Sequence, residues 1–452
     1  MQKTMVRDLT RGPVVPLLFK FAMPLFFSNA LQAVYNLVDM VVVGQVIGDA
    51  GMSAVSIGGD ILHLLTFIAM GFASAGQVLI ARAVGEQRPD DIRKTIGTMF
   101  TLLLSTSVGI ALICFGLRHH VLQWLNTPGE ALDYTMDYMV TCIVGLPFIY
   151  GYNIVSAILR GMGDSKRPFV FIAVAAVLNT ALDLLFVAVF KWEVFGAALA
   201  TVIGQGISFV ASIIYLYKKR EAFGFDFKPA SFRPDPVATK RLLALGIPMA
   251  IQSAAINLSK IVLSAWINAT GVENSALAGV YNKINMMAGI ISQSFTTAGS
   301  SMTGQNLGAR AYKRVNVILA TVLTVGLVIA VLGTGAMLLW PDAIYGMFNS
   351  KEGFAEAAAV LTLPIILNLF GSATRSAAFS LINGSGRSNL NLAVAIIDGV
   401  ISRVGLAALL GFALNMECKG FWLGDALAGF MPFVIGGTFY LSGRWKMEKK
   451  QA

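Results

Sequence analysis

The sequence predicts an all-α integral membrane protein with twelve transmembrane helices in two similar halves of six. Hydrophobic residues make up 56% of the 452 residues and charged residues only 13%, with a mean hydropathy of +0.71. A soluble protein of this length would need more polar surface. The chain also contains twelve apolar stretches, and its second half repeats the pattern of the first. Together these observations predict the class.

Each stretch is long enough to cross a bilayer core about 30 Å thick, which needs roughly 20 apolar residues. The predicted helices cover residues 15–45, 53–80, 94–117, 133–159, 168–190, 195–217, 240–269, 276–304, 315–340, 355–383, 390–413 and 420–442. The first is too long for a cleaved signal and lacks an obvious small-residue cleavage site. We therefore expect it to remain as the first transmembrane helix.

The basic residues that give the net charge of +10 lie mostly on one side of this arrangement. Twenty-five Lys and Arg residues fall in the two termini and the loops on their side, against four in the opposite loops: Arg118, Lys191, Lys351 and Lys419. The positive-inside rule places both termini in the cytoplasm. We therefore expect a multi-pass protein of the cytoplasmic membrane, with the lipid bilayer rather than nucleic acid as its partner.

Other chemistry has little support in the sequence. The few cysteines and histidines show neither a disulfide framework nor metal-ligand spacing; they are Cys114, Cys142, Cys418, His63, His119 and His120. The sequence contains no Ser/His/Asp motif and no Walker loop, so we expect neither an enzyme nor a built-in ATP motor, and no cofactor.

The two halves are related by an offset of 223 or 224 residues. FAMPLFFSNALQAVYNLVD, which starts at Phe21, resembles LGIPMAIQSAAINLSKIVL, which starts at Leu245, and sets Pro24 on Pro248. Three further matches follow in the same order, which indicates duplication. Each half has an even number of helices, so both enter the membrane in the same direction, related by an axis along its normal.

This repeat predicts the domain boundaries. We expect an N-lobe at 1–217, a cytoplasmic inter-lobe loop at 218–239 with little internal structure, and a C-lobe at 240–452 that ends in a basic tail. The loop is rich in Lys, Phe and Pro, which is typical of an irregular connection.

The first helix carries a polar stripe at intervals of three or four residues, formed by Ser28, Gln32, Tyr35, Asn36 and Asp39. These positions share one helix face, which should point to protein or water and not to lipid. The stripe serves either as ligands or as polar contacts that hold helices together.

Two acids lie at similar depth within the first half, Asp39 on the first helix and Asp183 on the fifth. An ionisable residue in the membrane core costs roughly 2.5–3.5 kcal/mol on insertion scales and is a functional candidate by default. Asn179 lies one turn before Asp183 on the same face. Two carboxylates with oxygens from Asn179 and Thr201 could replace the hydration of a hard cation such as Na⁺.

The same acids could instead exchange a proton, because desolvation and like charge raise a carboxyl pKa. The sequence does not separate Na⁺ from H⁺ as the coupling ion, and Asp39 and Asp183 are metal ligands only if the ion is Na⁺. The structural alternative is that both acids hydrogen-bond to neighbouring helices. Asp60, in the outer third of the second helix, is equally open to a functional role and to contact with outside water.

The helices of the second half are basic, carrying Lys260, Lys283, Arg375 and Arg403. Lys260 lies at the repeat position of Asn36, and Asp398 is the only acid that we place within these helices. We expect a basic network partly neutralised by Asp398, which would disfavour purely cationic substrates and accept anionic or zwitterionic ones. The alternative is that the basic side chains snorkel or pair structurally.

Pro24 lies inside the first helix, where it removes a backbone hydrogen bond. It permits either a static kink or a hinge on the path below Asp39.

The helix count, the duplicated plan, Pro24 and Asp39 of the first helix, and the QNLGAR segment at Gln305 together resemble the multidrug and toxic compound extrusion (MATE) transporters. The resemblance covers essentially the whole chain. It implies a cation-coupled antiporter that exports small amphiphilic drugs or metabolites by alternating access between its two lobes.

Within that family the chain resembles the subgroup with an N-lobe cation site. The resemblance assigns Asp39, Asn179, Asp183 and Thr201 to the cation, and Pro24 and Tyr138 to the same cavity. Another subgroup carries acids where this chain has Gln252, Lys283 and Arg375, so a C-lobe cation site is not expected. We place along the cavity and substrate pathway Gln32, Tyr35, Asn36, Tyr138, Gln252, Lys260 and Lys283.

Two other functions remain open from the sequence. A lipid-linked sugar flippase or polysaccharide exporter of the same superfamily would share the architecture and fit the basic C-lobe. A membrane enzyme would be expected to show a clustered nucleophile or metal motif, and a scaffold would leave the buried acids unexplained. Nothing in the sequence requires more than a monomer.

Overall fold

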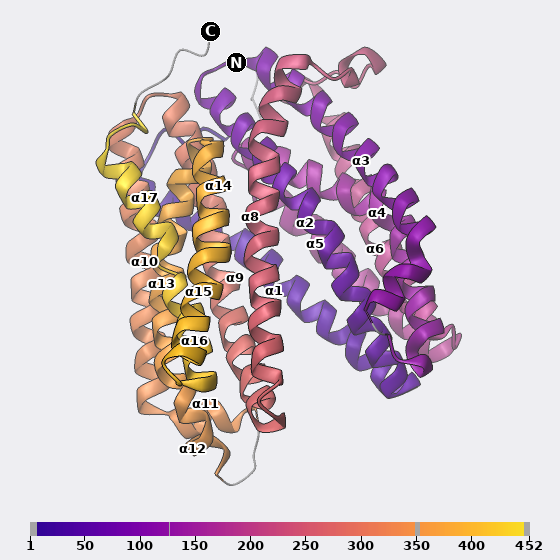
Figure 1. Ribbon diagram of the computed structural model, residues 1–452. Helices are drawn as coiled ribbons and strands as arrows, with labels where there is room; N and C mark the ends of the chain where they lie inside the picture. The colour runs from indigo at the N-terminus through magenta and orange to yellow at the C-terminus, as the bar shows by residue number, and fades with distance from the viewer. Residues whose placement is uncertain (1–6, 126, 349–352, 447–452) are drawn as a thin grey trace. The chain divides into compact units, whose positions relative to one another are not determined.

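The structure is a computed structural model that describes residues 7–125, 127–348 and 353–446 (Figure 1). The described residues form helices and no strand. The first half contains α1 (Val14–Ile47), α2 (Asp49–Gly85), α3 (Pro89–Trp124), η1 (Gly129–Ala131), α4 (Leu132–Gly161), α5 (Lys166–Asp183), η2 (Leu184–Val189), α6 (Glu193–Lys218), α7 (Arg220–Phe223) and η3 (Pro229–Phe232).

The second half begins with α8 (Pro236–Asn268), α9 (Val272–Gly308), α10 (Tyr312–Leu339), α11 (Pro341–Gly346), α12 (Phe354–Ala358), η4 (Ala359–Leu361) and α13 (Thr362–Gly384). It continues with α14 (Ser388–Ile396), η5 (Ile397–Ser402), α15 (Arg403–Ala408), η6 (Leu409–Ala413), α16 (Glu417–Ala428) and α17 (Met431–Leu441). η2, η5 and η6 are π-helical, so the predicted fifth and eleventh spans are not uniform α-helices.

The twelve-helix membrane architecture is confirmed. Eleven helical spans within the described residues are long and apolar enough to cross a membrane. The remaining predicted span lies in α9, which has 37 residues but is more polar. Many of its hydroxyl and amide side chains are buried, among them Ser301, Thr303 and Gln305, and α9 packs on α10 and α13. Polar residues are tolerated there because they face protein instead of lipid.

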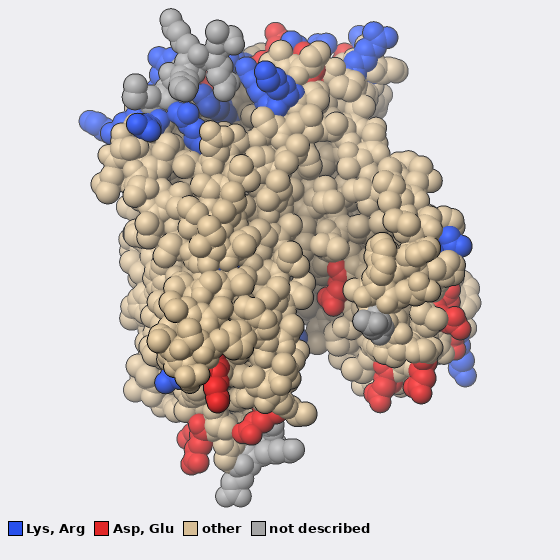
Figure 2. Space-filling model, viewed as in Figure 1, with Lys and Arg blue, Asp and Glu red and all other residues tan. Residues whose placement is uncertain are grey.

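On the one face that Figure 2 shows, most charged side chains lie near the ends of the helices. On the face shown in Figure 2, basic side chains gather at one end of each half and the middle is almost wholly uncharged. Of the basic residues counted for topology, Lys3, Lys351, Lys449 and Lys450 lie outside the described residues.

The described chain packs as two compact units. The first unit comprises residues 7–8 and 23–250, and the second comprises 9–22 and 251–446. These limits differ from the repeat boundaries at 217 and 240, because the start of α1 packs within the second unit, where the Phe19 and Phe295 rings lie 5.6 Å apart. Likewise, the first turns of α8 pack on α2, where Gly71 closely approaches Ala250.

The inter-lobe loop has more structure than predicted. Its phenylalanines pack on α3: Phe225 is only 1% exposed, and the Phe100 and Phe232 rings lie 5.8 Å apart. The Asp235 backbone N–H donates to Thr98 over 3.1 Å. The prediction of little internal structure was wrong because the phenylalanines pack against the apolar surface of α3. The prediction had been based on the Lys and Pro content of the loop, which does not report this packing.

Asp235 also caps the start of α8. Its carboxylate accepts a hydrogen bond of 2.9 Å from the Ala238 backbone N–H, which holds the pKa of that carboxyl below its usual range. The Lys94 ammonium, 3.4 Å away, acts in the same direction. Charge on Asp235 therefore stabilises the helix start.

We expect a Gly97→Ala substitution to loosen this loop, because a Cβ at Gly97 would lie 1.9 Å from the Ser231 carbonyl oxygen, too close without a backbone shift. Overpacking of this kind costs about 1–3 kcal/mol. Chymotrypsin cleavage after the phenylalanines within 220–235 of the purified protein should accelerate about tenfold. Gly109→Ala is the matched control on the same helix, because nothing lies within 4 Å of its added Cβ. Equal cleavage rates in the two variants would contradict the close packing.

Candidate functional site

Three helices of the first unit bring the predicted cation-site residues together. α1 supplies Asp39, α5 supplies Asn179 and Asp183, and α6 supplies Thr201, and all four side chains are buried. α5 packs directly on α6. Gly204 permits the approach, since its missing Cβ would touch Asn179 at 3.4 Å.

Asp39 is held by neutral groups. The Thr201 hydroxyl donates to Asp39 Oδ2 over 3.4 Å. With the Asn179 amide assigned so that both of its atoms are satisfied, its Nδ2 donates to Asp39 Oδ1 over 3.1 Å and its oxygen accepts from the Thr201 backbone N–H over 3.2 Å. This assignment rests on the hydrogen-bond network. Asn179 and Thr201 therefore orient one carboxylate.

Asp183 differs from Asp39 in having no such support. It is 0% exposed, and neither of its carboxylate oxygens has a hydrogen-bond partner among the described residues. Asp39 is the charged neighbour that acts on it. A buried carboxylate with no donor is strongly unfavourable. The pair is therefore suited to hold a proton or a cation, and Asp183 offers two free oxygens for it.

Tyrosines line the same site. Tyr138 on α4 is buried within electrostatic range of Asp39 and Asp183. Tyr35, half-buried on α1, lies near Gln205 on α6 and Tyr152 on α4. Gln205 and Tyr152 are not among the site residues predicted from the sequence. Gln205 follows Thr201 by four residues on an otherwise apolar helix, and this spacing was the available signal.

The other polar candidates of the first unit are more accessible than the two acids of this cluster. Gln32 is half-buried, and Asn36 and Asp60 are exposed. α1 stays helical through Pro24, whose carbonyl accepts a hydrogen bond of 2.8 Å from the Ser28 hydroxyl.

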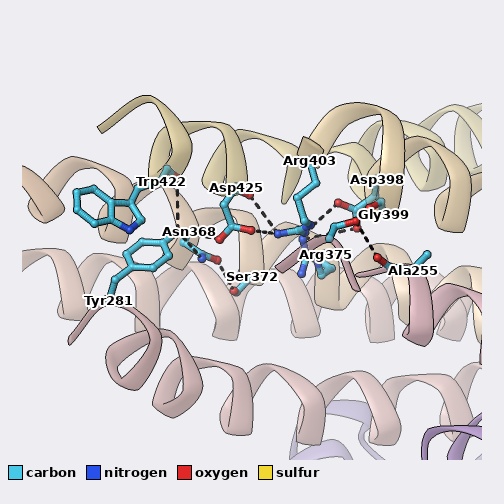
Figure 3. Close-up of polar contacts among 11 residues, drawn as sticks. Ala255, Tyr281, Asn368, Ser372, Arg375, Asp398, Gly399, Arg403, Trp422 and Asp425 are labelled. Carbon is cyan, nitrogen blue, oxygen red and sulfur yellow. Dashed lines mark hydrogen bonds and ion pairs between the residues drawn. The ribbon is translucent and has the colours of Figure 1, made fainter. Parts of the chain in front are cut away.

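The second unit contains a buried ionic cluster (Figure 3). Arg403 lies between two carboxylates: its Nη2 is 3.0 Å from Asp398 Oδ1, and its Nη1 pairs with Asp425 Oδ1. Arg375 Nη2 lies 3.6 Å from Asp398 Oδ2. The Tyr281 hydroxyl donates to Asp425 Oδ2 over 2.9 Å. The cluster thus joins α9, α13, η5, α15 and α16.

One expectation for the second half needs correction. Asp398 is not its only buried acid, because Asp425 on α16 is 6% exposed and paired with Arg403. Lys283 is exposed on α9 and takes no part in these ion pairs, as expected for an ammonium that keeps its hydration. Lys260 is exposed and Gln252 is buried, both on α8.

Comparison with known proteins gives a consistent result. The sequence matches the MatE family model over residues 24–185 and again over residues 248–409. It is 31% identical to the probable multidrug resistance protein YpnP of Bacillus subtilis over 311 residues, 68% of each chain. It is 27% identical to the probable multidrug resistance protein YoeA of the same organism, over 95% of this chain and 94% of that protein.

Among solved structures, an outward-facing multidrug resistance MATE family transporter of the MOP superfamily superposes with a TM-score of 0.88 at 21% identity. The match covers 99% of this chain and 100% of that chain.

Proposed function

Since this chain belongs to the MatE family and is therefore a membrane transporter and not an enzyme, we propose that it is a cation-coupled antiporter. It exports small amphiphilic compounds across the cytoplasmic membrane by alternating access, with both termini in the cytoplasm. The names of the related YpnP and YoeA proteins support drug-like substrates. The basic side chains at one end of each half support the orientation.

The observation that carries this proposal is the buried Asp39–Asp183 pair. Asp39 already has neutral donors, whereas both oxygens of Asp183 lack partners. A Na⁺ ion would take oxygens from both carboxylates, from Thr201 and from the Asn179 amide. A proton would instead remove one of two like charges. Either ion relieves the same electrostatic cost, and the residues fit both.

Coupling follows if the ion and the substrate favour different conformations. The ion stabilises the state in which Asp39 and Asp183 are close, and its release permits the other state. Pro24 supplies the hinge in this proposal. The division of α1 between the two units falls between Ala22 and Met23, next to this proline, and the division of α8 falls near Pro248 in the same way. Weakened helix hydrogen bonding makes both points suited to bending.

The proposed lobes are the repeat halves, 1–217 and 240–452, joined by the 218–239 loop. Within the N-lobe, Tyr35 and Tyr138 would line the pathway beside the acids, with Gln32 and Asn36 farther along α1. Gln252 and Lys260 would contribute from α8. Lys283, which the sequence also placed on this pathway, is exposed on α9.

Efflux from proteoliposomes under an imposed Na⁺ gradient and, separately, an imposed pH gradient tests the proposal. We expect one of the gradients to raise efflux of a fluorescent amphiphile by about 5-fold to 150-fold, the usual range of coupling between two ligands. Efflux that depends on neither gradient would overturn antiport and favour the alternative of a lipid-linked sugar flippase or polysaccharide exporter.

A further inference from the structure

Each unit has a helix–helix contact at the same repeat position, and the two contacts are formed by different side chains. In the first unit, Asn179 contacts Thr201, 22 residues farther along. In the second, Arg403 contacts Asp425, also 22 residues farther along. An offset of 224 relates the two pairs, and the same offset relates the two family matches, which start at 24 and 248 and end at 185 and 409. Arg403 therefore occupies the repeat position of Asn179, and Asp425 that of Thr201.

The acids of the first unit have no counterpart at this offset. Asp39 corresponds to Leu263, and Asp183 corresponds to Ala407, both buried. The second unit thus carries a permanent guanidinium cation where the first has neutral ligands. Arg403 is 1% exposed and occupies one oxygen of Asp398 and one of Asp425. This arrangement leaves no vacancy for a mobile cation.

Although Arg403 pairs with both acids, the basic residues in this region outnumber the acidic ones. Together with Lys260, which lies within electrostatic range of the cluster, the basic residues number three, Lys260, Arg375 and Arg403, against the two acids Asp398 and Asp425. Arg375 has a single ion-pair contact, at 3.6 Å, and its buried Nε has no hydrogen-bond partner among the described residues. Its side chain is 18% exposed against 1% for Arg403, so Arg375 is the more accessible of the two guanidinium groups.

Lys260 on α8 is also exposed. It has no ion pair within 4.0 Å among the described residues, and Asp425, Arg403, Arg375 and Asp398 all lie within electrostatic range of it. The preceding residue, Ser259, fixes α8 against η5, since its hydroxyl donates to the Gly399 carbonyl, next to Asp398. The close approach of Ala255 to Gly399 requires a glycine there. Lys260 is therefore held near Arg375 and is not a freely placed surface lysine.

We propose that Lys260 and Arg375 bind an anionic group of the transported substrate, a carboxylate or a phosphate. The inference rests on the proposed export function and names its substrate class: amphiphiles that carry an anionic group, including zwitterions. Arg375 offers a planar guanidinium suited to paired hydrogen bonds, and Lys260 offers a point charge. An anion would supply a negative partner to Lys260 and a further one to Arg375. It would thereby lower the cost of placing these positive charges within membrane helices.

Equilibrium binding to the purified full chain in a neutral detergent tests this independently of ion coupling. The probes are a zwitterionic amphiphile with one carboxylate and the methyl ester of the same compound. We expect the native protein to prefer the carboxylate, and Lys260→Gln and Arg375→Gln each to weaken carboxylate binding by about tenfold. Ester binding should change little. Lys419→Gln, which alters an exposed lysine of α16 outside the cluster, is the matched control.

Equal weakening of both probes, or no effect of Lys260→Gln, would overturn the proposal. Lys260 is exposed, so its variant should fold even if Arg375→Gln does not, and Lys260→Arg should restore the carboxylate preference. Repeating the measurement with added anionic phospholipid identifies a competing source. Suppose that the protein shows no preference for the carboxylate probe without the lipid and binds the lipid itself in a manner that depends on Lys260. The site would then belong to a lipid headgroup, and the substrate assignment would be overturned. Loss of gradient-driven efflux with these binding results intact would instead count against antiport alone.

Discussion

Asp183→Asn is expected to reduce gradient-driven efflux to the level seen without a gradient, a loss of about 10-fold to 100-fold. The substitution keeps the shape of the side chain and removes the charge that would attract the ion; a hydrogen bond to a charged group contributes about 1.5–3 kcal/mol. Asp39→Asn should have the same effect, because the two carboxylates form one site. Efflux assays in proteoliposomes with equal reconstituted protein measure the loss.

The same substitution should not lower stability. Asp183 has no hydrogen-bond partner among the described residues, so its carboxylate is stabilised only when an ion or proton is bound. Neutralising it should leave the unfolding temperature unchanged or higher in the absence of the coupling ion. Asp60→Asn is the control, since Asp60 is exposed on α2 and should tolerate the change with efflux intact. A variant that unfolds early and loses efflux would mean that Asp183 is structural.

Arg403→Met is expected to destabilise the protein by about 3–5 kcal/mol. The change leaves Asp398 and Asp425 buried without their shared partner, and removal of one member of a buried ion cluster costs about this much. Thermal unfolding of the purified protein in detergent measures it. Lys283→Met, on an exposed lysine, should have an effect below about 0.5 kcal/mol.

Simultaneous neutralisation separates the electrostatic cost from lost packing. Adding Asp398→Asn and Asp425→Asn to Arg403→Met should recover most of the lost stability, because the effects of residues in one network are not additive. A triple variant less stable than Arg403→Met would show that the carboxylates are stabilised by other neighbours.

The helices and the first-unit site were accessible from the sequence for a simple physical reason. Hydropathy reports length and burial in lipid directly, and intramembrane acids are costly enough for Asp39 and Asp183 to stand out against apolar neighbours. The i,i+4 spacing then paired Asn179 with Asp183. Even α9 was identified, although its buried hydroxyl groups make it more polar than the other spans.

What the sequence did not reveal depends on contacts between distant segments. Asp425 lies near one end of its span among glycine and alanine, so its sequence surroundings gave no sign of the pairing with Arg403. The loop at 218–239 looked irregular because composition does not show that Phe225 has a pocket on α3. Lys283 was placed on the pathway by its repeat and family position, neither of which shows that it makes no ion pair with the buried cluster.

The π-helical segment η5 explains why side chains after it keep the same orientation in both repeats although the repeat offset changes by one residue. Earlier matches in the chain, such as Arg160 with Asn383, are offset by 223 residues, whereas the later family match ends with an offset of 224. The second half therefore holds one additional residue in this interval, and η5 lies within it.

In a regular α-helix, one inserted residue would turn every later side chain by about 100°. A π turn confines the added residue locally. Deletion within η5 would therefore rotate Arg403 away from Asp425, so the pairing of these two charges depends on the length of the helix that precedes them.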